Sequence, residues 1–352
     1  MPVKVLVVDD SALMRRLLSD LLNSDPRIQV VGAAPDPFVA REQIKVLNPD
    51  VMTLDIEMPR MDGLTFLEKL MALRPMPVVV VSTLTQKGAD AVIRALELGA
   101  VDCIAKPLID LRVGMTALRD ELVAKVLIAA SSRPGVRAGN ASRGKPLTFD
   151  PHLSTTGWIV AVGASTGGVE ALQVLLTSMP SNAPAILVTQ HMPPGFTTSF
   201  AQRLDQRCAM PVFEATDGQR VMPGQIYIAH GGRHLELVRS GAHYACRLHD
   251  GPPVSGHRPS VDVLFTSVAG AAGKNAIGVI LTGMGQDGAA GLLEMRRAGA
   301  RTRGQDEASC VIYGMPKAAK LLGAVEVERP LSKMAAEILG LTQERRAKQA
   351  GA

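Results

Sequence analysis

Apolar residues in the first third of the chain follow two alternating patterns. Short continuous runs, typical of buried strands in a parallel sheet, lie at Val3–Val8, Val30–Ala33, Val51–Leu54, Val78–Val81 and Cys103–Ala105. Helical spacing appears between the runs, most clearly after Ser11 and again over Ala89–Leu98, where Gly99 is a suitable helix end. The alternation of strand and helix predicts a doubly wound α/β domain.

The apolar pattern is lost in the middle of the chain. A helix is expected over Met115–Ala130, but Ser131–Thr156 has no apolar period and is rich in Pro, Gly, Ser and cations. This composition is typical of a solvated linker. We therefore expect a first domain over residues 1–122, a linker over 123–155 and a second domain over 156–345.

The second domain returns to alternating strands and helices. Strands are predicted at Trp158–Val162, Ala185–Thr189, Ile226–Ala229 and Ala276–Leu281. A helix is predicted over Val169–Met179, and the segment from His230 to Leu248 is more strand-like. We expect an α/β domain with a mainly parallel sheet, interrupted by an antiparallel hairpin.

The composition is that of two aliphatic cores. Of the 352 residues, 47 % are hydrophobic and only 3 % aromatic, so Val, Leu, Ile, Met and Ala must fill the interiors. No apolar run reaches the roughly 18 residues needed to cross a bilayer. The N-terminus lacks the features of a signal peptide. We expect a cytoplasmic protein without membrane insertion.

Charge and cysteine content argue against two further classes of protein. The net charge is +5, but the basic residues are scattered and no Lys/Arg block is present, so a nucleic-acid partner is not expected. The four cysteines show no C-x-x-C spacing, which disfavours a zinc site or a redox motif.

Charged and polar residues gather where the strands of the first domain end. Asp9 and Asp10 follow the first strand, Asp55 the third and Lys106 the last, while Ser82 follows Val78–Val81. Carboxylates converging at one sheet edge favour a hard cation such as Mg²⁺, and the lysine and serine could bind a phosphoryl group. A single Asp in such a place more often caps a helix, but the full set favours a site.

These residues lie in motifs that resemble a response-regulator receiver domain. The matching pieces are Val7-Val8-Asp9-Asp10-Ser11, Leu54-Asp55-Ile56-Glu57-Met58-Pro59, Met61-Asp62-Gly63, Ser82 and Lys106-Pro107. The resemblance implies a flavodoxin-like fold in which Asp55 accepts a phosphoryl group from a sensor histidine kinase. It further implies that Asp10, Asp55 and the Glu57 carbonyl bind Mg²⁺, with Asp9 nearby, and that Ser82 and Lys106 contact the phosphoryl group.

Two details of this resemblance concern the last strand. It implies a cis bond between Lys106 and Pro107, which X–Pro dipeptides tolerate. The family often has an aromatic switch residue three positions before the lysine, and this chain has Cys103 there. Signalling by an aromatic side-chain flip is therefore not expected.

The second domain opens with a glycine-rich turn that contains a serine. Gly163-Ala164-Ser165-Thr166-Gly167 fits G-x-S-x-G between a strand and a helix, which exposes a serine hydroxyl. His191, just after the strand Ala185–Thr189, is the best candidate base, and Asp287, after Ala276–Leu281, could orient it. From the residues alone, a catalytic triad and a structural turn stay open alternatives. A dinucleotide turn is disfavoured because G-x-G-x-x-G is absent.

The second domain also resembles the catalytic domain of chemotaxis protein-glutamate methylesterases. The shared motifs are Gly163-Ala164-Ser165-Thr166-Gly167-Gly168, Gln190-His191-Met192, Gly256-His257-Arg258-Pro259-Ser260-Val261-Asp262 and Thr282-Gly283-Met284-Gly285-Gln286-Asp287-Gly288. The resemblance implies a triad of Ser165, His191 and Asp287, with Thr166 and Met284 beside it.

The two resemblances together imply a phosphorylation-activated enzyme. Its substrates would be methylated glutamates on chemoreceptors, with deamidation of glutamines at equivalent sites, and hydrolysis would need no cofactor. The unphosphorylated receiver would restrain the catalytic domain. The alternatives are a DNA-binding output, which predicts a basic recognition helix that the second domain lacks, and a catalytically inactive module that docks on receptors.

Overall fold

The computed structural model describes residues 1–58, 61–83, 85–106, 115–132 and 157–350. The chain divides into two compact units, Met1–Arg137 and Ala138–Ala352. The expected Lys106–Pro107 cis bond lies outside the described residues, and the exact domain boundaries stay predictions. No helix among the described residues is long and apolar enough to cross a membrane.

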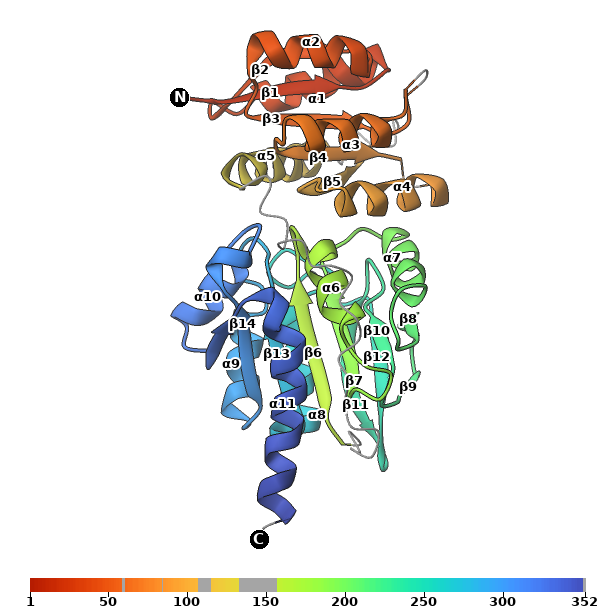
Figure 1. Cartoon of the computed structure of the whole chain (residues 1–352), viewed down its shortest axis with the longest axis vertical. Helices are drawn as coiled ribbons and strands as arrows, with labels where there is room; N and C mark the ends of the chain where they lie inside the picture. Colours follow the sequence, from red (N-terminus) through yellow and green to blue (C-terminus); the bar gives the residue numbers. More distant parts are fainter. Residues whose placement is uncertain (59–60, 84, 107–114, 133–156, 351–352) are drawn as a thin grey trace. The chain divides into compact units, whose positions relative to one another are not determined.

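The first unit is a five-stranded parallel sheet with the strand order β2-β1-β3-β4-β5 (Figure 1). The strands are β1 Val3–Val8, β2 Ile28–Ala34, β3 Val51–Asp55, β4 Val78–Ser82 and β5 Asp102–Ala105. The helices are α1 Ala12–Asn23, α2 Pro37–Leu47, α3 Gly63–Leu73, α4 Gln86–Glu97 and α5 Met115–Ser131. The predicted flavodoxin-like topology is confirmed, and its winding changes direction between β1 and β3, where ligands bind in such sheets.

Side-chain caps start four of the five helices in this unit. Ser11, Asp36, Asp62 and Thr85 each accept a hydrogen bond from an amide in the first turn that follows. A polar cap satisfies amides that have no partner within the helix. Because Ser11 and Asp62 start the helices after β1 and β3, the carboxylates at those strand ends do not serve as caps.

The second unit contains a seven-stranded parallel sheet with the order β15-β14-β13-β6-β7-β10-β8. The strands are β6 Ile159–Ala164, β7 Ala185–Gln190, β8 Val212–Glu214, β10 Ile226–Ile228, β13 Ala276–Ile280, β14 Arg301–Gln305 and β15 Val327–Arg329. The predicted antiparallel hairpin is present as β11 His234–Ser240 and β12 His243–His249. It does not interrupt the parallel sheet, because it forms a separate three-stranded sheet with β9 Arg220–Val221.

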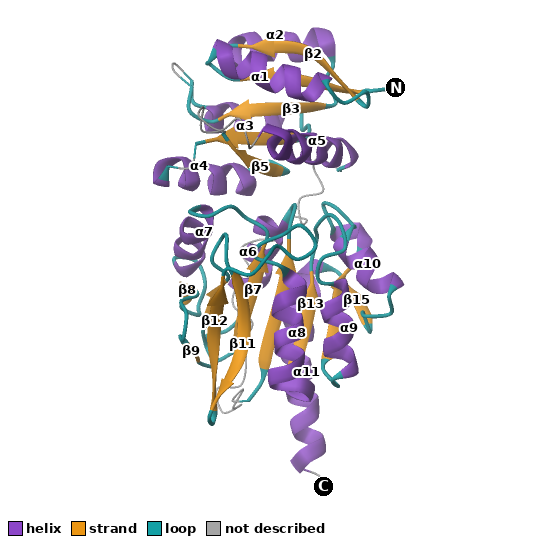
Figure 2. Cartoon of the chain, turned by 180° about the vertical axis from the view of Figure 1, so that it is seen from behind, coloured by secondary structure: helices purple, strands orange, loops and turns teal. Residues whose placement is uncertain are grey.

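Helices cover both faces of the seven-stranded sheet (Figures 1 and 2). They are α6 Gly168–Thr177, α7 Phe196–Asp205, α8 Val261–Ala272, α9 Ala289–Arg297, α10 Met315–Leu321 and α11 Leu331–Ala350, with short 3₁₀ turns at Gly273–Asn275 and Glu307–Ser309. Apolar side chains of α8 and α9 join those of β6, β11 and β12 in one buried cluster, including Phe265 and Leu292. In Figure 1, α11 crosses in front of β6 and β13 on the opposite face.

A buried cation links β14, the strand next to the edge of this sheet, to α11. Arg303 on β14 is only 2 % exposed. Its Nη1 lies 2.8 Å from Glu326 Oε2, and its Nε lies 2.7 Å from Glu337 Oε1 on α11. A guanidinium can be buried in this way only when carboxylates balance its charge and acceptors bind its N–H groups.

Replacing Arg303 by Ala should lower the free energy of unfolding of the second unit by about 3 kcal/mol, because a fully buried side chain is lost and the ion-pair network that it joins is broken. Among the described residues, Glu326 and Glu337 would each keep only one arginine partner, Arg301 and Arg329 respectively. Trp158, the only tryptophan, directly precedes β6, so its fluorescence during urea titration reports on this unit. Arg297→Ala, at an exposed position, is the control. Equal midpoints for both variants would contradict a stabilising role for the Arg303 ion pairs.

Candidate functional sites

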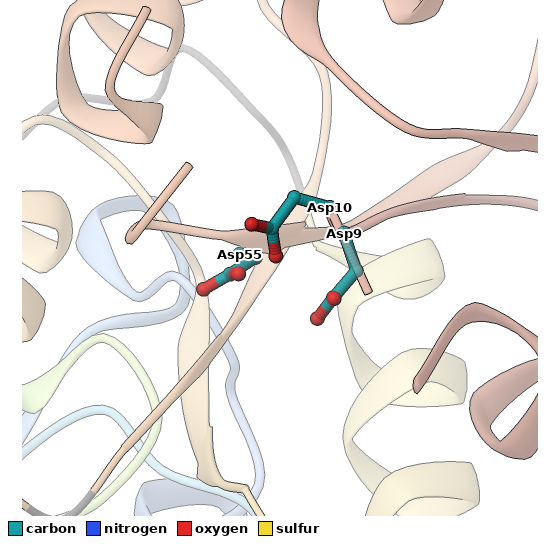
Figure 3. A group of neighbouring side chains, drawn as sticks. All are labelled: Asp9, Asp10 and Asp55. Carbon is teal, nitrogen blue, oxygen red and sulfur yellow. The ribbon is translucent and has the colours of Figure 1, made fainter. Parts of the chain in front are cut away.

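Three carboxylates meet at the ends of β1 and β3 in the first unit (Figure 3). Asp9, Asp10 and Asp55 each offer an oxygen within 4.8 Å of the others. Asp9 and Asp55 are buried, whereas Asp10 is exposed. The predicted cluster is therefore assembled at the point where the winding of the sheet reverses.

Lys106 supplies the positive charge at this cluster. Its Nζ lies 2.7 Å from Asp55 Oδ2 and 3.0 Å from Asp9 Oδ2. Burial nevertheless raises the pKa of Asp55 to about 6, even though the lysine acts to lower it and Asp9 adds to the increase. One ammonium thus does not balance the carboxylates, and the oxygen-rich donor set fits a hard divalent cation.

Two other predicted residues lie beside Asp55. The Glu57 amide donates to Asp55 Oδ1 at 3.1 Å. Ser82 is fully buried one position beyond Val81, the partner of Asp55 in the β3–β4 ladder. The Ser82 Oγ has no hydrogen-bond partner among the described residues, so this hydroxyl is available to a group bound at Asp55.

Cys103 lies on β5, at the position where receiver domains often have an aromatic switch residue. The side chain is 4 % exposed, and burial raises the pKa of its thiol to about 12. The thiol is therefore neutral and unreactive, and the side chain is part of the core of the first unit.

Ser165 lies at the C-terminal edge of the seven-stranded sheet, on the turn between β6 and α6. Its amide donates to the Thr282 carbonyl at 3.1 Å, which ties the turn to the segment after β13. The turn depends on small residues. A Cβ on Gly168 would lie 2.1 Å from Gln190 Oε1, and Gly167 has a positive φ of 76°.

His191 follows the neighbouring strand, in the register that brings it beside this turn. Ala164 pairs with Gln190 in the β6–β7 ladder, and the His191 amide donates to the Ala164 carbonyl at 3.1 Å. Gln190 adds a second link, because its Nε2 donates to the carbonyls of Ser165 (3.0 Å) and His191 (3.1 Å). The serine and histidine segments are therefore held together through their main chains.

The imidazole of His191 is paired with Asp287. The distance from His191 Nε2 to Asp287 Oδ2 is 2.7 Å, and Asp287 is 1 % exposed. Among the described residues no hydrogen bond joins Ser165 to His191, whose Nδ1 is buried without a partner. Nδ1 is therefore the ring nitrogen that is not engaged by Asp287.

The Asp287 carboxylate is also bound by the start of α8. It accepts from the Ser260 hydroxyl (2.8 Å) and from the amides of Val261 (2.8 Å) and Asp262 (3.1 Å). Burial acts to raise the pKa of Asp287, but His191 and these donors hold it below its ordinary value. Asp287 is therefore an ionised acceptor that requires the proton of His191 on Nε2.

The two residues expected beside the triad differ in exposure. Thr166 is buried, and its carbonyl accepts from Thr282 Oγ1 at 3.1 Å. The Met284 side chain is 43 % exposed. It follows Gly283, where a Cβ would lie 2.8 Å from the Ser165 Cβ. Both residues thus flank the serine turn.

Sequence reasoning assigned no role to three residues that contact this site. Ser260 bonds Asp287, Gln190 links the two turns, and the ring of His257 stacks on His191. All three lie in the motifs quoted above. The available signals were the serine immediately before the apolar run of α8 and the glutamine next to the candidate base.

Comparisons with known proteins match both units. Residues 160–338 match the family described as CheB methylesterase, and residues 5–119 match the response regulator receiver domain. A Pectobacterium atrosepticum protein named protein-glutamate methylesterase/protein-glutamine glutaminase is 58 % identical over 324 residues, which is 92 % of each chain. A Xanthomonas campestris pv. campestris protein with that name, numbered 1, is 53 % identical and covers 98 % of this chain and 99 % of its own.

A solved structure agrees with the second unit. The crystal structure of the Thermotoga maritima CheB methylesterase catalytic domain has a TM-score of 0.52 and 38 % sequence identity. The match covers 53 % of this chain and 99 % of that one.

Replacing Asp55 by Asn should stabilise the metal-free first unit by on the order of 1 kcal/mol, because the environment disfavours the ionised carboxyl. The same change should weaken stabilisation by MgCl₂, since a cation ligand is lost. Thermal unfolding in EDTA and in MgCl₂ measures both effects.

Asp20→Asn is the control for this comparison, because Asp20 is exposed on α1. An Asp55→Asn protein that gains as much from MgCl₂ as the wild type would contradict a cation site at Asp55.

Proposed function

The chain belongs to the CheB methylesterase family, and from this we propose that it hydrolyses glutamyl methyl esters and deamidates glutamines on chemoreceptors under the control of its receiver domain. The match of both units to the family and the names of relatives at 53 to 58 % identity support this activity. The observation that carries the chemistry is the His191–Asp287 pair beside the Ser165 turn.

In the proposed reaction Ser165 is the nucleophile and His191 the general base. Asp287 holds the proton on Nε2, so the lone pair on Nδ1 takes the proton from Ser165 Oγ as that oxygen attacks the ester carbonyl. Amides of the turns at Thr166 and Met284 bind the oxyanion. Methanol, or ammonia from a glutamine, leaves with the proton of His191.

Water completes the cycle by attacking the acyl-enzyme with the same general base. The products are a glutamate carboxylate, a proton and free Ser165, so atoms and charge balance with side chains and water alone. These steps need no cofactor. Asp287 contributes by keeping the imidazole in one tautomer and by stabilising its cation.

In the first unit, we propose that Asp55 accepts a phosphoryl group from a sensor histidine kinase. Asp10, Asp55 and the Glu57 carbonyl would hold Mg²⁺, with Asp9 nearby, and the ion would offset charge on the phosphoryl oxygens. Lys106 and the Ser82 hydroxyl would bind those oxygens. Phosphorylation would then shift the chain from a restrained to an active population.

Replacing Ser165 by Ala should reduce methanol release from methylated receptor fragments by about 10³-fold or more, because no other hydroxyl replaces the nucleophile. Ser240→Ala, at the exposed hairpin end, should keep wild-type activity. A fluorescent serine-directed phosphonate should label the wild type and Ser240→Ala but not Ser165→Ala. Absence of labelling and of methanol release in the wild type would instead favour a receptor-docking module.

A small phosphodonor such as acetyl phosphate, with MgCl₂, should raise methanol release severalfold in the wild type and leave Asp55→Asn unchanged. The reason is that only an ionised carboxylate can form the acyl phosphate. Asp20→Asn should respond like the wild type. Equal activation of Asp55→Asn would show that Asp55 is not the acceptor.

A further inference from the structure

A second histidine ring lies flat against the candidate base. The rings of His191 and His257 are stacked with centroids 3.7 Å apart and planes only 14° from parallel. The reaction proposed above gives His257 no chemical step. Its ring covers one face of the imidazole whose edge must carry a proton from Ser165.

His257 is held in this place by a tight turn. Val254 and His257 exchange both main-chain hydrogen bonds, at 3.0 and 2.9 Å. Ser255 and Gly256 between them have positive φ values of 53° and 80°, as in a type I′ turn. A non-glycine residue rarely adopts this conformation. The turn that positions His257 therefore requires an unfavourable backbone conformation at Ser255.

The residue after His257 anchors the same segment. The Arg258 guanidinium donates to the carbonyls of Asp250 (3.0 Å) and Gly251 (3.1 Å). Two residues further on, Ser260 starts α8 and donates to Asp287. One short stretch of chain thus contacts both members of the pair, His191 through a ring and Asp287 through a hydroxyl and amides.

These contacts constrain the His191 ring in different ways. The covalent bond to Cβ and the hydrogen bond from Nε2 to Asp287 hold two ends of the ring, but they leave it able to rotate about the Cβ–Cγ bond, which moves Nδ1 more than Nε2. A flat neighbour on one face opposes this rotation. The orientation of the ring matters because Nδ1 is not hydrogen-bonded to Ser165 in this structure and must come within reach of its hydroxyl during the reaction.

We propose that His257 is a positioning residue of the esterase, whose ring holds the plane of His191 so that Nδ1 faces Ser165. The inference rests on the proposed function and adds a residue to it. The contribution of His257 is the flat face of its ring rather than proton transfer. An aromatic ring without nitrogen should therefore replace it, and an aliphatic side chain should not.

The test compares His257→Phe, which keeps a flat ring, with His257→Leu, which does not. Methanol release is measured with the full chain, phosphodonor and methylated receptor fragments. Leu should lower kcat on the order of 10²-fold with little change in KM, because misplacement of a catalytic group affects the chemical step. Phe should stay within about threefold of the wild-type kcat. His243→Leu, at an exposed hairpin position, is the control.

Two further measurements distinguish a misplaced His191 ring from a general loss of packing. Urea unfolding followed by Trp158 fluorescence shows whether each variant is folded, and the rate of phosphonate labelling reports the reactivity of Ser165 directly. The labelling rate should fall with kcat in His257→Leu and recover in His257→Phe. If the leucine variant does not fold, His257→Gln, which also lacks a ring face, takes its place.

Two outcomes would overturn the inference. A ringless variant with wild-type kcat would show that the stack is not needed, and a phenylalanine variant as slow as the ringless one would show that a flat face is not sufficient. Ser165→Ala is measured in parallel. If it stays active, the proposed function fails; if it is inactive while the ringless variant keeps full kcat, only the role of His257 fails.

Discussion

The catalytic end of the second unit depends on how one buried carboxylate is satisfied. Removing Asp287 from water would be prohibitive without partners, and it accepts from His191, from the Ser260 hydroxyl and from two amides at the start of α8. These donors come from segments far apart in the sequence. Each can reach the carboxylate only if β7, α8 and the segment after β13 are in their native places, so the position of the His191 imidazole follows from the fold of the whole unit.

In each unit the candidate site lies at the C-terminal edge of a parallel sheet, but the charges at that edge are satisfied differently. At the ends of β1 and β3, three carboxylates are brought together around the Lys106 ammonium, and burial raises the pKa of Asp55. At the ends of β6, β7 and β13, the Asp287 carboxylate accepts hydrogen bonds from several donors and its pKa is lowered. The first arrangement fits a hard divalent cation, whereas the second keeps Asp287 ionised and paired with the His191 imidazole.

Much of this could be predicted from the sequence, because parallel strands place their ends on a common edge. The strand runs, the hairpin and the polar residues at strand ends followed from short patterns. Strand β14 was not predicted, since a buried strand containing Arg303 appears polar until its glutamate partners are known. The stack of His257 on His191 was not predictable either. The stack depends on the positive φ of Ser255 and on a contact between two segments that are far apart in the sequence. No pattern in the sequence indicates that these segments meet.

The topology also explains why Nε2 of His191, rather than Nδ1, is paired with Asp287. In the familiar serine protease arrangement Nδ1 faces the carboxylate and Nε2 the serine, whereas here Nε2 binds Asp287. Nδ1 is closer to the main chain of the histidine than Nε2 is, which favours a partner close to that main chain. Ser165 is such a group, because the His191 amide bonds to the residue just before it. Asp287 follows β13, which lies on the far side of β6 from β7, and only the outer end of the ring can reach it. The order of the strands therefore accounts for the pairing of Nε2 with Asp287, and it leaves Nδ1 as the nitrogen for the proposed role as general base.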